Sequence, residues 1–433
     1  MRLIRNLLAV GTVALLLATP VQARPTAEDV TSLWYRLVLE LVRHTPTYTP
    51  PVASRSFAYV GVAQFEAVAS GAPELHSLAG QLNGFSAPPP RPDGVIDEAV
   101  VVQAVLSASI RSFFFNTGPT GQRAMTAVEA KLTAEVAEGL APDVVERSRA
   151  YGAAVATHVL TWSKTDGGAV IENMGFPYEY TLNAGPERWV PTNLVRQQQA
   201  PLLPNWGNNR TFATPSGKAC PVPPHPAYSE DPASDFYKEA MEVYQAKAAL
   251  TPEQTVIARS WSDDPMLSTT PPGHWVSIAR QILERDAAPL AQQAEVMAKL
   301  GVGLADAFIG CWDAKFQYDL LRPVTYIRRV IDPTWEPLLN TPPFPEFPSG
   351  HSTQSGTADV VLTALFGEDF AFDDNTMEPD GLPPRSFTSF RQAAEEAGIS
   401  RLYGGIHFRA AIALGLAQGR CIGAYVVALR TRN

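Results

Sequence analysis

Two cationic side chains, Lys315 and Arg322, fall on the apolar stripe of a predicted long helix. The stripe repeats at steps of three and four residues, which is typical of one helix face: Met297, Leu300, Leu304, Phe308, Cys311, Lys315, Tyr318 and Arg322. Burying a cation costs free energy unless an anion meets it. The pattern therefore predicts an anion site. The alternative is that both cations reach outward at the helix end or pair with Asp313 or Asp319.

A second group, Pro348-Ser349-Gly350-His351, has the composition of a helix start. Ser349 suits the N-cap position, and Gly350 has no Cβ, so backbone N–H groups there can approach an oxyanion closely. His351 then stands in the first turn, beside whatever anion binds. Taken alone, these four residues favour an ordinary N-cap with a surface histidine.

The third group is Ser400-Arg401, followed by a Gly-Gly turn and then by His407, which we expect to open the last helix. The turn lets Arg401 and His407 converge, although a histidine satisfied in the core is the commoner case for such a group alone. The three groups together place three cations, a helix N-terminus and two histidines within the C-terminal part of an acidic chain. Arginine binds oxyanions through two parallel N–H donors. The interpretation is a pocket for a tetrahedral or trigonal-bipyramidal oxyanion.

The ordered motifs resemble those of a known superfamily. Lys-x6-Arg-Pro at 315–323, Pro-Ser-Gly-His at 348–351 and Ser-Arg-x5-His at 400–407 are similar to the three signatures of type 2 phosphatidic acid phosphatases and vanadium haloperoxidases. Trp-Ser-Asp-Asp at 261–264 and Thr-Pro-Pro-Gly-His-Trp at 270–275 resemble the exported bacterial haloperoxidase branch. The resemblance covers most of the mature chain. It implies an all-α fold of two helical bundles, with the anion in the C-terminal bundle.

The resemblance also implies a vanadate cofactor and a role for each motif residue. Vanadate would be held by five side chains and one backbone amide: Lys315, Arg322, Ser349, Arg401, His407 and the amide of Gly350. His407 would be the axial metal ligand through a ring nitrogen, His351 the acid/base at the peroxide, and Lys315 the group that polarises bound peroxide. A halide would then attack oxygen and leave as hypohalous acid. The implied partners are hydrogen peroxide, a halide and a small organic acceptor, with the halide and the acceptor left open.

Three further positions concern the branch of the family. Trp312 resembles the tryptophan that lines the haloperoxidase pocket, and Phe344 stands where chloroperoxidases carry Phe and bromoperoxidases carry His. In haloperoxidases one acidic residue supports the histidine of the second motif. We expect this residue to be Asp263, with Asp264 as the alternative. His274 is expected to be structural rather than a ligand.

One position departs from the family pattern. The phosphatase motif continues as His-x3-Asp, and many haloperoxidases keep this Asp, but the fourth residue after His407 is Ala411. The departure leaves the nucleophile without the expected orienting carboxylate. It therefore weakens the alternative function, a soluble exported acid phosphatase with a phosphohistidine at His407 and with His351 protonating the leaving group. A third hypothesis is a non-enzymatic oxyanion-binding relative.

The elements that must position these residues are helices, because β-type alternation is nearly absent along the chain. We expect a helical region over 24–163, an irregular Pro/Gly/aromatic region over 164–233 and a helical region over 234–433. In the first region the helical pattern begins at Ala27 and breaks at Pro46–Pro51. Helices are expected over these ranges: 95–116, 119–163, 234–248, 252–262, 273–286, 291–321, from about 349, 387–397 and 408–429. Residues 369–384 are expected to form an acidic loop.

Composition limits the classes of partner. The 433 residues are 45% hydrophobic and 18% charged, which suits one large or two fused folded domains. The net charge of −9 argues against nucleic-acid and anionic-membrane surfaces. The last helix is apolar but carries Gln418 and Arg420, which indicates a buried helix rather than a membrane span. Cys220, Cys311 and Cys421 allow at most one disulfide, and Cys311 is expected in the core.

The first 23 residues are typical of a secretory signal peptide. Arg2 and Arg5 precede a short apolar run, and Val21-Gln22-Ala23 offers small residues for cleavage. Removing them changes the net charge to −11. We therefore expect a periplasmic or secreted protein that is not an integral membrane protein, with a retained N-terminal anchor as the alternative. The resemblance is compatible with homo-oligomers.

Overall fold

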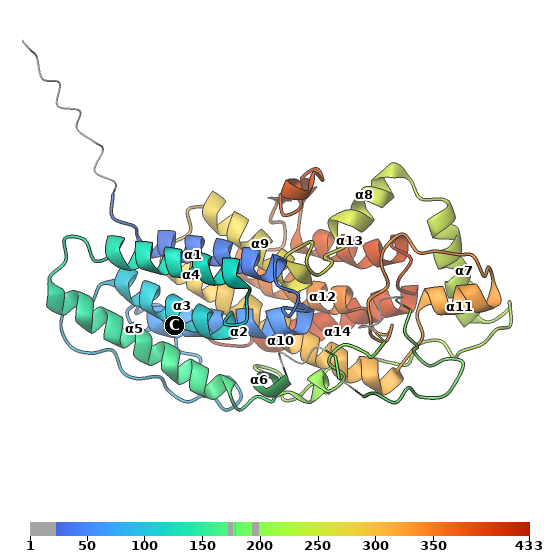
Figure 1. The fold of residues 1–433 in the computed structure, drawn as a ribbon, viewed down its shortest axis with the longest axis horizontal. Coiled ribbons are helices and arrows are strands. Elements are labelled where there is room, and N and C mark those ends of the chain that lie inside the picture. The colour runs from blue at the N-terminus through green and yellow to red at the C-terminus, as the bar shows by residue number, and fades with distance from the viewer. Residues whose placement is uncertain (1–22, 172–175, 178, 193–198) are drawn as a thin grey trace, which may run out of the picture.

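Helix α10 (Leu290–Tyr318) runs through the middle of an elongated molecule and joins its two halves (Figure 1). It lies against α2 (Pro50–Ala69) on the N-terminal side and against α12 (Gly350–Phe366) on the C-terminal side. The computed structural model describes residues 23–171, 176–177, 179–192 and 199–433. The predicted signal peptide therefore lies almost entirely outside the described residues.

The described chain is all-α apart from one small sheet, which confirms the predicted fold class. The remaining helices of the N-terminal half are α1 (Ala27–Arg43), α3 (Glu98–Phe113), α4 (Pro119–Glu135), α5 (Pro142–Ser163) and α6 (Gly168–Ile171). The other elements are η2 (Trp206–Asn208), α7 (Asp235–Ala248), α8 (Pro252–Ser260), α9 (Thr270–Arg285), α11 (Pro323–Val330), β1 (Phe372–Asp374), η3 (Glu378–Asp380), β2 (Arg385–Phe387), α13 (Phe390–Tyr403) and α14 (Arg409–Val427). Strands β1 and β2 pair antiparallel, with Phe372 opposite Phe387.

Close helix crossings hold the core together. A Cβ added to Gly301 of α10 would lie 2.8 Å from the carbonyl oxygen of Phe57 in α2, so only glycine permits this approach. The same holds where α14 crosses α12, because a Cβ on Gly419 would lie 1.9 Å from the Thr353 oxygen. The first contact joins α10 to α2 and the second joins α14 to α12, and α10 also packs on α12 and α14. The candidate site is built around the ends of α10, α12 and α14. The predicted domain boundaries at 163 and 233 stay predictions.

The predicted break at Pro46–Pro51 is too long at its C-terminal end. The prolines at 50 and 51 do not belong to the break but form the first turn of α2, where a missing N–H costs nothing. The stretch 119–163, predicted to be helical, contains two helices, α4 and α5. Gly139, with φ of 74°, lies in the turn between them, and Pro142 begins α5.

The limits of three C-terminal helices also differ from prediction, and each difference affects a site residue. Helix α10 stops at Tyr318 because Asp319 adopts the left-handed conformation, with φ of 51°. Arg322 is therefore not on the long helix but is the N-cap of α11. Helix α13 runs on to Tyr403 and so contains Arg401. Helix α14 begins two residues after His407, not at it.

Part of the predicted acidic loop over 369–384 is ordered as strand β1, which carries Asp374. This residue reaches the candidate site, as described below. Cys220 and Cys421 form a disulfide, and Cys311 is a free, buried cysteine on α10, as expected.

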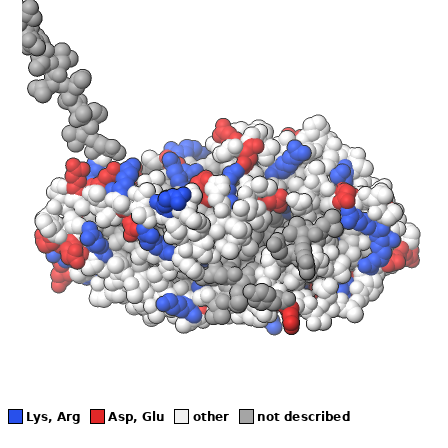
Figure 2. All heavy atoms as spheres, viewed as in Figure 1, with Lys and Arg blue, Asp and Glu red and all other residues white. Residues whose placement is uncertain are grey.

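Helix α14 is, among the described residues, the one helix long and apolar enough to cross a membrane by length and composition. It packs along α12 with one face, and 44% of its most apolar stretch is buried. Gln418 donates to the carbonyl oxygens of Cys220 and Gly310, and Arg420 pairs with Asp359 at 3.0 Å. These polar contacts tie the packed face of α14 to neighbouring segments of the protein. Figure 2 shows basic and acidic side chains over one face of the molecule, with acidic residues beside the group of basic ones at its right-hand end.

Candidate active site

A cavity of about 350 Å³ opens where the α8–α9 loop, α10, α12, α13 and the segment before α14 meet. Seven of the predicted residues line it: Asp263, Trp312, Phe344, Gly350, His351, Arg401 and His407. Lys315, Arg322 and Ser349 lie just behind this lining and are fully buried. Residues up to 144 positions apart in the sequence thus meet around one space, although the role of each stays a prediction.

His407 is held on both sides of its ring. Its Nδ1 lies 2.8 Å from Oε1 of Glu346, and its Nε2 lies 3.2 Å from Nη1 of Arg322. An arginine N–H can only donate, so Nε2 must be an acceptor that carries a lone pair. Burial, together with the charges of Arg322 and Lys315, holds the pKa of His407 well below its usual value. Nε2 therefore stays unprotonated at neutral pH, with its lone pair directed at Arg322.

Glu346 is a site residue that the sequence motifs do not include. Its carboxyl group is fully buried, and Oε1 also accepts from the Phe408 amide at 2.9 Å. Burial raises the pKa of Glu346 to about 8 against the opposing charge of Arg322. The expectation that Ala411 leaves His407 without an orienting carboxyl group is therefore wrong. The one available signal was an acidic residue inside the apolar, proline-rich run at 342–348.

Arg322 is positioned to bind an anion. Its Nε donates to the carbonyl oxygen of Phe344 at 2.9 Å, and its Nη1 donates to that of Ile406 at 3.0 Å. Among the described residues, its buried Nη2 has no hydrogen-bond partner. A buried charged donor without a partner is costly, and an oxyanion would satisfy it. The residues present therefore fit a small oxyanion such as vanadate or phosphate.

The ammonium group of Lys315 already has hydrogen-bond partners. Its Nζ donates to three carbonyl oxygens, those of Pro345 at 2.9 Å, Glu346 at 3.0 Å and Pro348 at 2.5 Å. Burial lowers the pKa of Lys315 to about 7. Lys315 therefore contacts an anion only by exchanging one of these carbonyl groups for it.

The start of α12 supplies neutral donors. Ser349 is the N-cap, and its Oγ accepts from the amide of Ser352 at 3.2 Å and from the Ser352 hydroxyl at 2.9 Å. The hydrogen of the Ser349 hydroxyl is therefore available to another acceptor. A Cβ on Gly350 would make only ordinary contact with Trp312 at 3.7 Å, so glycine here serves access to the backbone rather than packing.

Phe344 and Trp312 form the apolar wall of the cavity. Their rings lie 4.9 Å apart, and the Phe344 ring also faces Lys315 Nζ at 5.1 Å and Arg322 Cζ at 5.0 Å. Cations over an aromatic ring are attracted to its negative face. The wall therefore helps to hold both cations in place.

His351 lies across the cavity beside Asp263. Its Nε2 is 3.4 Å from Oδ2 of Asp263 and 3.4 Å from Nη1 of Arg401. Of the two acidic candidates, Asp263 is thus the residue next to His351. Asp263 also has a φ of 53°, a conformation that asparagine and aspartate tolerate better than most residues. Burial and the charge of Arg401 lower the pKa of His351 to about 4.

His274 clamps Asp263 from the other side. Its Nδ1 lies 2.8 Å from Oδ1 of Asp263, and its Nε2 lies 2.7 Å from Oδ2 of Asp374 in β1. Trp261 stacks on the imidazole at 4.3 Å. Burial would lower the pKa of His274, but the two carboxylates outweigh burial and raise it to about 10. The clamp holds the pKa of Asp263 well below its usual value, despite burial.

This clamp predicts a pH-dependent stability. Unfolded histidine titrates near pH 6.5, so His274 stabilises the fold fully below that pH and loses its contribution as pH rises toward about 10. In urea unfolding, the difference in free energy between wild type and His274→Gln should shrink with pH by up to about 1.4 kcal/mol per unit in this window. The exposed His44→Gln serves as the control. A difference that stays constant from pH 6.5 to 10 contradicts the prediction.

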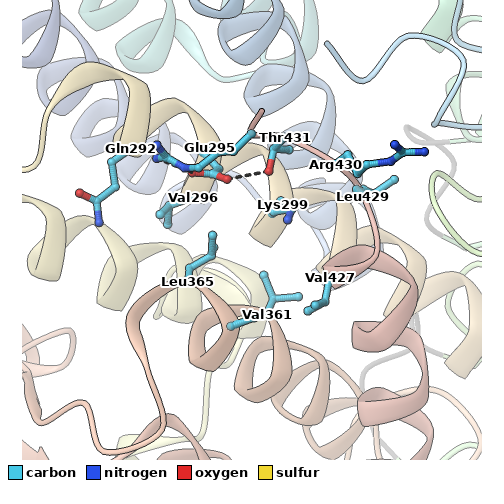
Figure 3. Close-up of a pocket in the computed structure, with 12 residues that line it drawn as sticks. Gln292, Glu295, Val296, Lys299, Val361, Leu365, Val427, Leu429, Arg430 and Thr431 are labelled. Atoms are coloured by element: carbon cyan, nitrogen blue, oxygen red, sulfur yellow. Dashed lines mark hydrogen bonds and ion pairs between the residues drawn. The ribbon is translucent and has the colours of Figure 1, made fainter. Parts of the chain in front are cut away.

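A larger cavity, of about 590 Å³, lies away from this cluster (Figure 3). Figure 3 shows Glu295 directed toward Thr431, and Glu295 also pairs with Arg432 at 2.6 Å. No histidine is among the described residues that line this cavity. Size alone therefore does not locate the chemistry, whereas the imidazoles and buried cations do.

Comparison with known proteins identifies the family. A crystal structure of a bacterial vanadium-dependent iodoperoxidase matches with 40% identity and a TM-score of 0.85, over 96% of this chain and 98% of that chain. The chain belongs to the vanadium haloperoxidase family. A family model described as the VCPO second helical-bundle domain matches residues 295–432.

Two more distant vanadium haloperoxidases are also similar. The vanadium chloroperoxidase of Curvularia inaequalis is 30% identical over 199 residues, which is 38% of this chain and 32% of that protein. The aligned stretch thus spans about a third of the length of that relative. A bacterial vanadium-dependent chloroperoxidase shares the fold at 17% identity and a TM-score of 0.65, covering 95% of this chain and 94% of that one.

Proposed function

We propose that this protein is a vanadate-dependent haloperoxidase, which oxidises a halide with hydrogen peroxide to hypohalous acid that halogenates an organic acceptor. The observation that carries the proposal is the placement of His407 Nε2, an unprotonated imidazole nitrogen among buried cations. His351 lies across the same cavity from it. We further propose iodide as the preferred halide, because iodide is the easiest to oxidise and the relative with 40% identity is an iodoperoxidase.

Vanadate, when bound, supplies a Lewis-acidic centre that activates peroxide without changing its own oxidation state. His407 would hold it through Nε2. Arg322 Nη2, the Ser349 hydroxyl and the Gly350 amide are donors for its oxygens, and Arg401 and Lys315 compensate its charge. Arg322 Nη2 has no partner to give up, whereas Lys315 must exchange a carbonyl group and His407 Nε2 must release Arg322 Nη1 when the anion binds.

His351 is the proposed general acid–base residue. Oxidation of a halide by peroxide transfers two electrons from halide to peroxide oxygen and consumes one proton, giving hypohalous acid and water. With its pKa near 4, His351 is neutral at neutral pH and can accept a proton from peroxide. Asp263, 3.4 Å from Nε2, stabilises the protonated form, which can then return the proton.

The test is a reconstitution assay. Purified protein incubated with orthovanadate should halogenate a phenol-type dye when supplied with peroxide and iodide, and more slowly with bromide. The same protein without vanadate is the control. Failure with every halide after confirmed vanadate binding contradicts the proposal.

A phosphatase is the second candidate, and one observation favours it. Glu346 supplies the orienting carboxyl group that the sequence pattern lacks at position 411, so a base–orienter pair for a histidine nucleophile exists. In this alternative, His407 Nε2 attacks phosphorus and His351 protonates the leaving group. Release of phosphate from an aryl phosphate, inhibited by vanadate and without halide oxidation, would reverse the ranking.

Removal of Arg322 should weaken oxyanion binding in either case. Arg322→Gln leaves a bound anion under-compensated, so the affinity for vanadate should fall by about 2–4 kcal/mol. Isothermal titration of vanadate into the protein measures this. Arg409→Gln is the matched control, because Arg409 is exposed and pairs with Glu242. An affinity equal to wild type means that Arg322 does not contact the anion.

We also propose that the protein is exported to the periplasm or secreted. The Cys220–Cys421 disulfide supports this, since disulfides persist in oxidising compartments. Cell fractionation with N-terminal sequencing of the mature protein tests the proposal, and an uncleaved cytoplasmic product contradicts it.

A further inference from the structure

We propose that Glu346 is the positioning residue for His407, taking over from a different chain segment the task that the family assigns to an aspartate at position 411. The inference rests on the proposed function and concerns how the ring of His407 is oriented so that Nε2 faces the anion. Glu346 lies three residues before Ser349, whereas position 411 lies on α14.

Hydrogen-bond polarity supports the assignment. The Phe408 N–H can only donate, so Oε1 of Glu346, which receives it at 2.9 Å, acts as an acceptor. The His407 Nδ1 at 2.8 Å from the same oxygen must then carry the proton. Arg322 Nη1, also a pure donor, requires a lone pair at Nε2. Two independent contacts on opposite sides of the ring therefore select one tautomer.

The location of Glu346 links this tautomer to the rest of the site. Its own amide donates to the Leu320 oxygen at 2.9 Å, which anchors the segment after α10. The carbonyl groups of the same segment hold Lys315, and the segment continues into the Ser349 cap and His351. One stretch of chain thus orients the metal ligand and carries the neutral donors and the acid/base group. Oε2 has no hydrogen-bond partner among the described residues, so Oε1 makes the contacts that hold the carboxyl group.

Two conservative variants distinguish the effect of the length of the Glu346 side chain from the effect of its acidic group. Glu346→Gln keeps the length of the side chain and an acceptor oxygen but removes the acid. Glu346→Asp keeps the acid but is one methylene shorter, so its oxygen cannot occupy the Oε1 position. If Glu346 positions His407, the dissociation constant of Glu346→Gln for orthovanadate should lie within about threefold of the wild-type value. The affinity of Glu346→Asp for orthovanadate should fall about 10–100-fold, which is the usual loss when a group that supports a metal ligand is removed. If Glu346 acted only through its charge, Glu346→Asp would bind orthovanadate more tightly than Glu346→Gln.

The tautomer of His407 gives a second readout that activity does not influence. Long-range ¹H–¹⁵N spectra of the full chain with labelled histidine, assigned by difference from His407→Gln, should show Nδ1-protonated His407 in wild type and in Glu346→Gln. Glu346→Asp should show a mixture. Equal vanadate affinity in both variants, or an unchanged tautomer in Glu346→Asp, overturns the inference.

A parallel titration with inorganic phosphate separates this inference from the proposed function. If wild type oxidises no halide yet the two variants still rank in the predicted order for phosphate, the haloperoxidase proposal fails and the positioning role stands. If wild type is an active haloperoxidase and the order is reversed, the positioning role fails alone.

Discussion

Replacing His407 with alanine should abolish vanadate binding, and with it all halide oxidation. Nε2 of this residue is an unprotonated imidazole nitrogen among the buried cations, where it accepts from Arg322. Without it, the remaining donors can make only hydrogen bonds and ion pairs to the anion. Isothermal titration and ⁵¹V NMR measure the loss directly.

The same variant should still bind phosphate, though more weakly. Phosphate needs the cations and the amide donors rather than a metal–nitrogen bond, so residual binding shows that the pocket has kept its shape. His76→Ala is the control, because His76 is exposed and lies outside the cavity. Full vanadate affinity in His407→Ala would remove the assignment of the ligand.

Replacing His351 with alanine should have the second largest effect, and it should be confined to turnover. General acid–base groups contribute about 10²–10⁴-fold to rate, so kcat should fall by this factor. Vanadate affinity should change little, because the bond to the cofactor is assigned to His407. The measurement is steady-state iodide oxidation at saturating peroxide, together with vanadate titration of the same preparation.

Asp263→Asn provides a graded comparison for this second prediction. The amide keeps the size of the side chain but cannot stabilise a protonated His351, so kcat should lie between wild type and His351→Ala. A turnover in His351→Ala within about twofold of wild type would exclude His351 as the acid/base, because a general acid–base residue contributes far more than that.

Short-range patterns predicted much of the site. The Ser-Gly step at 349–350 marks a helix start because N-cap chemistry is local, and the structure places α12 there. The extent of α10 was harder to predict. The apolar stripe continues past its end, and only the left-handed turn at Asp319 moves Arg322 to the next helix. Arg322 nevertheless reaches the site, because its side chain contacts His407 from the start of α11.

Contacts between distant segments could not be predicted from the sequence. Asp374 contacts His274, which lies 100 residues earlier, and it comes from a stretch whose acidic, Gly/Pro-rich composition is typical of a surface loop. Glu346 is 61 residues from His407, and no spacing rule connects them. Such contacts between distant residues depend on how the helices pack against one another. The local periodicity of the sequence carries no information about that packing.

The most direct measurement is a crystal structure of the protein soaked in orthovanadate. We predict vanadium density bonded to Nε2 of His407, with oxygens facing Arg322 Nη2, the Ser349 hydroxyl and the Gly350 amide. An anion bound elsewhere, or density that leaves His407 uncoordinated while the protein is active, would contradict this prediction.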